Sequence, residues 1–218
     1  IYVLLALACV FALSSSIFAS EKSPVFAHTA DPEVTQLAES AVAARGDFMS
    51  EQYEVKSVEL SEGVLVQLLD QDKLAEAKEF KLDELVDEDY VGYLYLVNDA
   101  VPFRFVKGQN GFVNEGLGGY ADEFKGAVEL LSKLTDYAPL KVYTFGFLQP
   151  YLLVAEYKGV EYCVPFGTSD VFNENYARIN DLTLLPTVDE YLGFVQREIV
   201  SLKAAQEASK DLLYEIGR

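Results

Sequence analysis

The side chains that most often perform catalysis are scarce in this chain of 218 residues. His28 is the only histidine, and Cys163 is the only cysteine after Cys9. A nucleophilic serine or cysteine needs a base beside it, and a zinc site needs several histidines or cysteines. The sequence therefore disfavours a Ser-His-Asp or Cys-His site, and it predicts no catalytic residues, no cofactor and no metal centre.

Two further patterns have a loose resemblance to ligand-binding motifs. The run Gly116–Ala121 (GLGGYA) fits the G-x-G-x-x-A spacing of dinucleotide sites, but no hydrophobic strand immediately precedes it. The acidic residues at 83–84 and 87–89 lack the alternating oxygen ligands and the glycine of a calcium loop. We expect a flexible turn at the first and a solvated acidic turn at the second.

Tyrosine is the residue type that most suggests recognition, because it occurs 14 times. An exposed tyrosine offers a large contact area at low entropic cost, and alternation along a strand points some side chains outward. The alternative is aromatic pairing across strands, which stabilises a sheet without any ligand. The candidate binding residues lie on expected strands: Tyr93, Tyr95, Tyr151, Tyr157 and Tyr162.

The chain is strongly acidic, with 35 acidic against 17 basic side chains and a net charge of −18. Such a surface repels phosphate backbones, so we expect no nucleic-acid partner. Solubility outside the cell explains the acidity, and a basic partner or a cationic polymer is the functional alternative. Paired carboxylates can also hydrolyse glycans, although the sequence nominates no pair among so many.

The first 20 residues carry no charged side chain, and their apolar run passes into small residues. This pattern is typical of a secretory signal peptide, which we expect over residues 1–19, with cleavage after Ala19 or as late as Ala27. A retained membrane anchor is the alternative, since about 20 apolar residues can span a bilayer. With one cysteine left, no internal disulfide can form, which favours a bacterial exterior. We therefore expect a secreted or cell-surface protein without membrane contact after cleavage.

The rest of the chain alternates between helical and strand patterns. Asp31 and Pro32 open a helix that Gly46 closes. Residues 71–89 are ambiguous, and the glycine-rich stretch 108–119 reads as a connector. An apolar face from Tyr120 to Leu134 predicts a second helix. Alternating patterns predict strands at 53–60, 64–69, 93–97, 101–106, 141–148, 151–157 and 160–166, the last two joined by the tight turn Lys158-Gly159.

The C-terminal segment predicts a long helix. Thr187 and Glu190 form a capping box at its start. Apolar residues then recur with spacings of three and four, and we expect this face to be buried against the sheet: Val188, Leu192, Val195, Ile199 and Leu202, continued by Leu212 and Ile216. Glu190, Arg197 and Lys203 should lie in solvent.

Residues 93–106 resemble residues 151–164, which predicts two copies of a helix-plus-hairpin unit. Chance similarity between two apolar hairpins is the alternative. The modules would span residues 31–107 and 108–218. The expected fold class is α+β, with antiparallel sheets, helices packed on one face and a long C-terminal helix.

These observations favour an exported, non-catalytic protein that binds a protein or peptide through a tyrosine-rich sheet surface. One alternative is an extracellular enzyme that uses carboxylates, for example on a glycan. Another is an assembly or structural component that uses its C-terminal helix.

Overall fold

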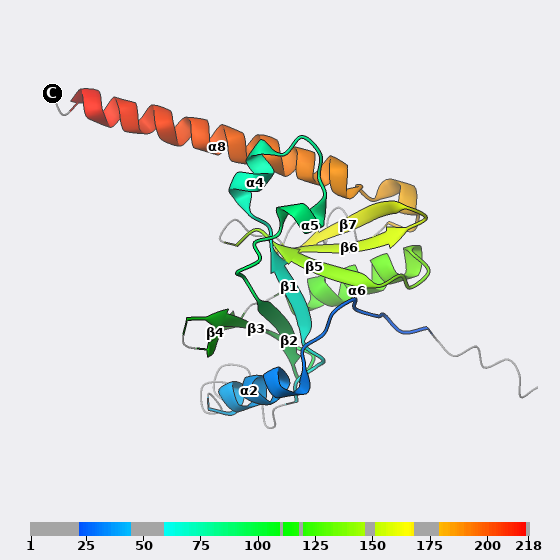
Figure 1. Cartoon of the computed structure of the whole chain (residues 1–218). Coiled ribbons are helices and arrows are strands. Elements are labelled where there is room, and N and C mark those ends of the chain that lie inside the picture. The colour runs from blue at the N-terminus through cyan, green and yellow to red at the C-terminus, as the bar shows by residue number, and fades with distance from the viewer. Residues whose placement is uncertain are drawn as a thin grey trace, which may run out of the picture.

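A seven-stranded sheet forms the centre of the computed structural model in Figure 1. The structure describes residues 22–44, 59–109, 111–117, 120–146, 151–167 and 179–216, so the expected signal peptide lies outside it. The strand order is β4-β3-β2-β1-β5-β6-β7, and every neighbouring pair is antiparallel except the parallel pair β1 and β5. The α+β class, the antiparallel pairing and the C-terminal helix are confirmed.

The described residues of the first half form these helices and strands: α2 (Pro32–Ala43), β1 (Val64–Leu68), α4 (Gln71–Glu76), α5 (Leu82–Leu85), β2 (Gly92–Val97), β3 (Val101–Gly108) and β4 (Gly111–Leu117). The expectation of a connector over 108–119 is wrong, because β4 pairs with β3 there. Its glycines hid the strand: Gly108 and Gly111 face each other at the turn, and Gly111 has a φ of 108°. Most of the expected strand 53–60 lies outside the described residues; Leu60 bridges to Val97.

The second half matches the sequence patterns closely. It contains α6 (Ala121–Leu134), β5 (Leu140–Thr144), β6 (Tyr151–Tyr157), β7 (Val160–Phe166), the short 3-10 helix η2 (Leu182–Leu184) and α8 (Val188–Ile216). Lys158 and Gly159 both have positive φ, as the predicted two-residue turn requires. None of the helices in the described part of the chain has both the length and the apolar character needed to cross a membrane.

Helices cover both faces of the sheet, which corrects the expectation that they pack on one face. On one face, α6 packs on apolar side chains from β1, β2, β5, β6 and β7. On the other face, α2 covers β2 and β3, while α4, α5 and α8 cover β5, β6 and β7. Because side chains alternate between the two faces along a strand, they therefore point toward a helix on either face, and not toward solvent on one of them.

The first half forms the four adjacent strands β1 to β4 after α2, the second half forms the three adjacent strands β5 to β7 after α6, and the two groups meet at β1 and β5. Tyr93 pairs with Phe105, and Tyr151 pairs with Phe166. In the sequence alignment of the two hairpins, however, Phe105 corresponds to Cys163. The duplication stays a prediction. Because β4 pairs with β3, the first group of strands extends beyond residue 107, and both groups share one sheet.

Candidate functional site

The five candidate tyrosines do not lie on one surface. Tyr95 and Tyr151 are buried, with 0% and 1% of their surface exposed, so the expectation that they present their rings to a partner is corrected. The reason is that α2 covers one ring and α6 the other. These two tyrosines belong to the core.

The other three tyrosines are half-buried and lie in two places. Tyr93 faces α2, and its ring centroid lies 6.0 Å from that of Phe112. Tyr162 packs on the α6 side of the sheet, and Tyr157 lies at the end of the same hairpin beneath the Lys158 ammonium group. A binding role for these three residues stays a prediction.

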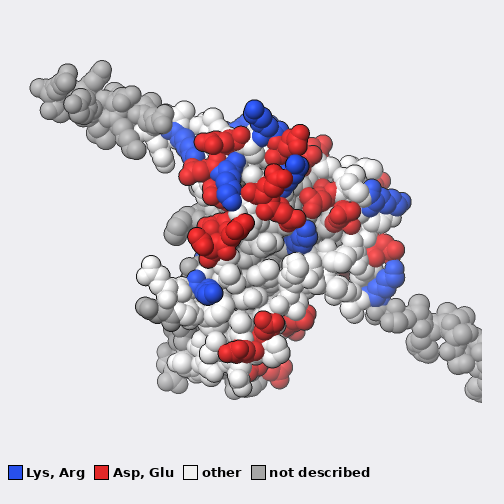
Figure 2. Space-filling view, in the orientation of Figure 1, with Lys and Arg blue, Asp and Glu red and all other residues white. Residues whose placement is uncertain are grey.

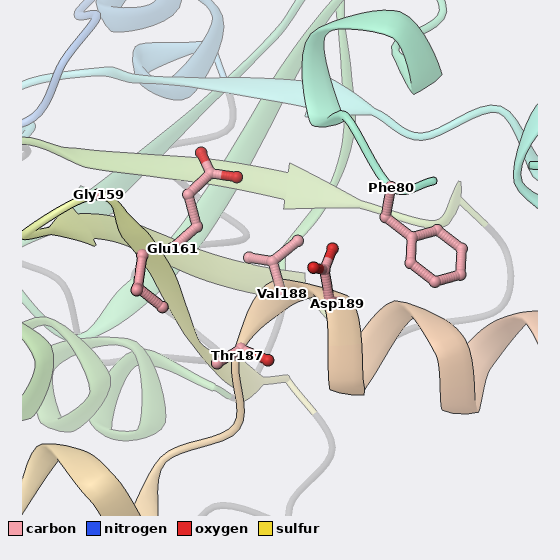
Figure 3. Close-up of a pocket in the computed structure, with 7 residues that line it drawn as sticks. Phe80, Gly159, Glu161, Thr187, Val188 and Asp189 are labelled. Atoms are coloured by element: carbon pink, nitrogen blue, oxygen red, sulfur yellow. The ribbon is translucent and has the colours of Figure 1, made fainter. Parts of the chain in front are cut away.

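A pocket of about 330 Å³ opens where the β6–β7 turn meets the start of α8. Figure 3 shows the Glu161 side chain on β7, Asp189 in the first turn of α8 and the Phe80 ring beyond Asp189. We call this the acidic pocket; its lining residues are Phe80, Gly159, Val160, Glu161, Thr187, Val188 and Asp189. None of the five candidate tyrosines is among them.

Hydrogen bonds at the start of α8 join the two walls of the acidic pocket. The predicted capping box is present: the Thr187 N–H donates to Glu190 at 2.9 Å, and the Glu190 N–H donates to Thr187 Oγ1 at 3.3 Å. The Cys163 N–H donates to the Pro186 carbonyl at 3.1 Å, and Thr187 bridges to Tyr162. The start of α8 is therefore fixed against the edge of β7, which places Asp189 and Glu161 on the wall of the same pocket.

Cys163 contributes to this junction as a structural residue. Its side chain is fully buried, and Sγ lies 3.7 Å from the carbonyl oxygens of Pro186 and Thr187. Burial raises the pKa of the thiol, and the nearby carboxylates of Glu190 and Glu161 raise it further. The thiol therefore stays protonated, which makes it a poor nucleophile.

Glu161 also lines a second, smaller pocket of about 170 Å³ together with Lys141 and Glu156. In the β6–β7 ladder, Glu156 lies directly opposite Glu161. Like charges in directly opposed positions destabilise an antiparallel pair. The carboxylate of Glu161 thus stands between two pockets and beside a second carboxylate.

The surroundings of Glu161, burial first among them, raise the pKa of its carboxyl. Burial raises the pKa of this carboxyl, Lys141 lowers it, and the negative charges of Asp83, Glu156 and Asp189 raise it again. The Lys141 Nζ atom lies 4.0 Å from Asp83 Oδ1, and it forms no ion pair with Glu161. No described residue forms an ion pair or a hydrogen bond with the Glu161 side chain. Figure 2 shows acidic side chains in excess over the part of the molecule that carries α4, α5 and α8.

A buried phenol belongs to the same neighbourhood. Tyr143 on β5 is fully buried, and its hydroxyl has no hydrogen-bond partner among the described residues. Burial raises the pKa of this phenol, and the carboxylates of Asp83 and Glu161 raise it further. Among the described residues, the Glu161 carboxylate and the Tyr143 hydroxyl therefore both lie in this region without a hydrogen-bond donor, and Lys141 is the positive charge near Glu161.

A second polar cluster lies on the α6 side of the sheet, and its groups are partnered. The Tyr120 hydroxyl donates to the Tyr151 hydroxyl at 3.0 Å, and Arg104 donates to the same oxygen at 3.3 Å. Burial and the contact with Tyr151 raise the pKa of Tyr120. We call these three residues, Arg104, Tyr120 and Tyr151, the phenol cluster. Nearby, the buried Glu123 accepts a hydrogen bond from the Gly167 N–H at 2.8 Å.

The sequence contained a signal for the carboxylate pair that composition alone did not reveal. A two-residue turn at Lys158-Gly159 fixes the hairpin register, and that register places Glu156 opposite Glu161.

Among the described residues, no group of three or more histidine, cysteine, aspartate or glutamate side chains is arranged to hold a metal ion. No protein family model, curated protein or solved structure matches this chain.

Proposed function

We propose that this chain is an exported, non-catalytic binding protein whose acidic pocket receives a lysine or arginine side chain of a basic protein or peptide. The observation that carries the proposal is the half-buried Glu161 carboxylate. It lies between two pockets and forms no ion pair or hydrogen bond with a described residue, and Lys141 is the positive charge that acts on it. Export is proposed from the uncharged, signal-like residues 1–19.

A bound cation would relieve the repulsion that the folded chain retains. Negative charge near the proposed cation comes from Glu156, Glu161 and Asp189. Phe80 adds an aromatic ring to the pocket wall. Cations interact favourably with both carboxylates and aromatic faces. The net charge of −18 would also accelerate the encounter with a basic partner.

Two of the five candidate tyrosines also have a place in this proposal. Tyr157 and Tyr162 lie on the β6–β7 hairpin that also carries Glu161, although they project on the α6 side. A partner that wraps around the end of this hairpin would contact the tyrosines and the acidic pocket together.

The test is a titration of the protein with a short fluorescent oligolysine peptide, followed by anisotropy at several salt concentrations. We expect saturable binding that salt weakens. Glu161→Gln should weaken it about tenfold, which corresponds to about 1.4 kcal/mol. The matched control is Glu33→Gln, which removes the same charge from an exposed position on α2 and should leave the affinity unchanged.

The proposal fails if Glu161→Gln and Glu33→Gln bind the peptide as tightly as the unmodified protein does. That result would mean that oligolysine senses only the overall charge. An oligoglutamate peptide of the same length should not bind, and equal binding of the two peptides would also contradict the proposal.

A second candidate function, a carboxylate-based enzyme acting on a glycan, is favoured by one observation. Glu156 and Glu161 lie directly opposite each other beside a pocket, and the pKa of Glu161 is raised as a general acid requires. Directly opposed side chains have Cβ atoms about 5 Å apart, which is compatible with the carboxyl separation of about 5 Å in retaining glycosidases. A reducing-end assay on bacterial and plant oligosaccharides tests it: release of new ends that Glu161→Gln abolishes would replace the binding proposal.

A further inference from the structure

The segment at residues 22–30 holds together the two halves of the sheet. It follows the start of β5 at Phe26, bends at Ala27 and then pairs with the start of β1 at Thr29. Beyond these starts, β1 and β5 pair with each other only at residues 66–68 and 142–144. We call residues 22–30 the N-terminal segment.

Four backbone hydrogen bonds fasten the N-terminal segment. Two of them join it to Leu140: the Ala27 N–H donates to the Leu140 carbonyl, and the Leu140 N–H donates to the Val25 carbonyl, both at 2.8 Å. The other two reach the β1 side, where the Leu65 N–H donates to the His28 carbonyl at 3.1 Å and the Ala30 N–H donates to the Gly63 carbonyl at 2.7 Å.

Side chains add to this attachment. The Phe26 ring stacks on Phe124 of α6 with a centroid distance of 6.0 Å, and it packs against the core of that face. The Lys22 ammonium group lies 2.6 Å from Asp136. Ala27 also forms part of the wall of the smaller pocket beside Glu161.

We infer that export processing cuts this chain after Ala19 and not after Ala27, so that the N-terminal segment remains in the mature protein as part of its fold. The inference rests on the export proposed above. A cut after Ala27 would remove Phe26 and both partners of Leu140. Leu140 is fully buried with the segment in place, and the cut would take away the hydrogen-bond partners of its N–H and its carbonyl. A cut after Ala19 leaves all four hydrogen bonds intact.

The experiment secretes the full chain, with an initiating methionine supplied, from a bacterial host and measures the intact mass of the extracellular product. We expect a chain that begins at Ser20. A product that begins at His28 would overturn the inference while leaving export standing. Recovery of the chain only with its apolar N-terminus attached to the cell would overturn both.

A stability comparison tests the structural reason independently of export. Chains produced to begin at Ser20 and at His28 should differ, with a lower melting temperature for the shorter chain. Within the longer chain, Phe26→Ala should lower the melting temperature, whereas Val25→Ala should not, because the Val25 side chain is 52% exposed. Equal melting temperatures for the two chains, or for Phe26→Ala and Val25→Ala, would contradict the role given to the segment.

Discussion

Two polar clusters on opposite faces of the sheet differ in whether their polar groups have hydrogen-bond partners. In the phenol cluster, Tyr120, Tyr151 and Arg104 satisfy one another through hydrogen bonds. In the acidic pocket, the Glu161 carboxylate has no hydrogen bond or ion pair to a described residue, and three carboxylates as well as Lys141 act on it. Polar groups that partner one another stabilise a fold, whereas unpartnered charges beside a cavity are available to a ligand. We therefore propose that the first cluster supports the fold and that the second takes part in recognition.

The largest expected effect removes the shared member of the phenol cluster. Tyr151 is buried, and its ring stacks on Phe166 with a centroid distance of 5.1 Å. Tyr151→Ala should lower the free energy of unfolding by about 3–5 kcal/mol because it leaves a cavity. Tyr151→Phe keeps the ring and should cost only about 1 kcal/mol, as measured by urea denaturation. If folded Tyr151→Phe lost oligolysine binding with unchanged stability, the phenol cluster would be a recognition site.

The next effect concerns the anchor of the acidic pocket. Leu192 and Ile199 attach α8 to the core, with 0% and 3% exposure, and Leu192→Ala should cost about 2–5 kcal/mol. Leu202, which the sequence pattern predicts to be buried, is 49% exposed. Figure 1 shows that α8 continues past the sheet, so the length of its apolar pattern does not predict how far the helix is covered. Leu202→Ala should therefore stay within about 0.5 kcal/mol in thermal denaturation.

A smaller effect is expected at the start of α8. Thr187→Ala removes the cap and should cost about 1 kcal/mol. Hydrogen bonds from Thr187 lower the pKa of Glu190, so the contribution of Glu190 is present above its unfolded-state pKa. It is lost as the pH falls through the lowered folded-state pKa. Urea midpoints between neutral and acidic pH measure this loss, and Thr187→Ala should show less of it.

The smallest effect has the opposite sign. Because folding raises the pKa of Glu161, its ionised form destabilises the protein above the folded-state pKa. The penalty decreases as the pH falls below that pKa and is gone below the unfolded-state pKa. Glu161→Gln should therefore stabilise the protein at neutral pH, by about 0.2–1 kcal/mol for an opposed like-charge pair, and should not stabilise it at acidic pH. Destabilisation at neutral pH would show that the carboxylate has a partner in the fold.

Sequence reasoning succeeded where the pattern is local and failed where packing decides. The limits of β6 and β7, their turn and the capping box of α8 follow from alternation, backbone conformation and short spacing. The strand β4 was missed because its glycines resemble a connector. The burial of Tyr95 and Tyr151 was missed because alternation cannot reveal that helices cover both faces.

The candidate site was only partly accessible from the sequence. The hairpin register that opposes Glu156 and Glu161 follows from the turn at Lys158-Gly159. The approach of Asp189 and Phe80 does not, because it depends on how α8 and the loop before α5 pack on the edge of β7. Tertiary contacts between segments distant in the chain leave no local spacing to recognise.

The central claim is that a basic side chain neutralises Glu161. The most direct measurement is the pKa of the Glu161 carboxyl by carbon NMR, assigned with Glu161→Gln, without and with saturating oligolysine. The account predicts a pKa above the ordinary glutamate value in the free protein and a lower pKa in the complex. A pKa that saturating peptide leaves unchanged would contradict it.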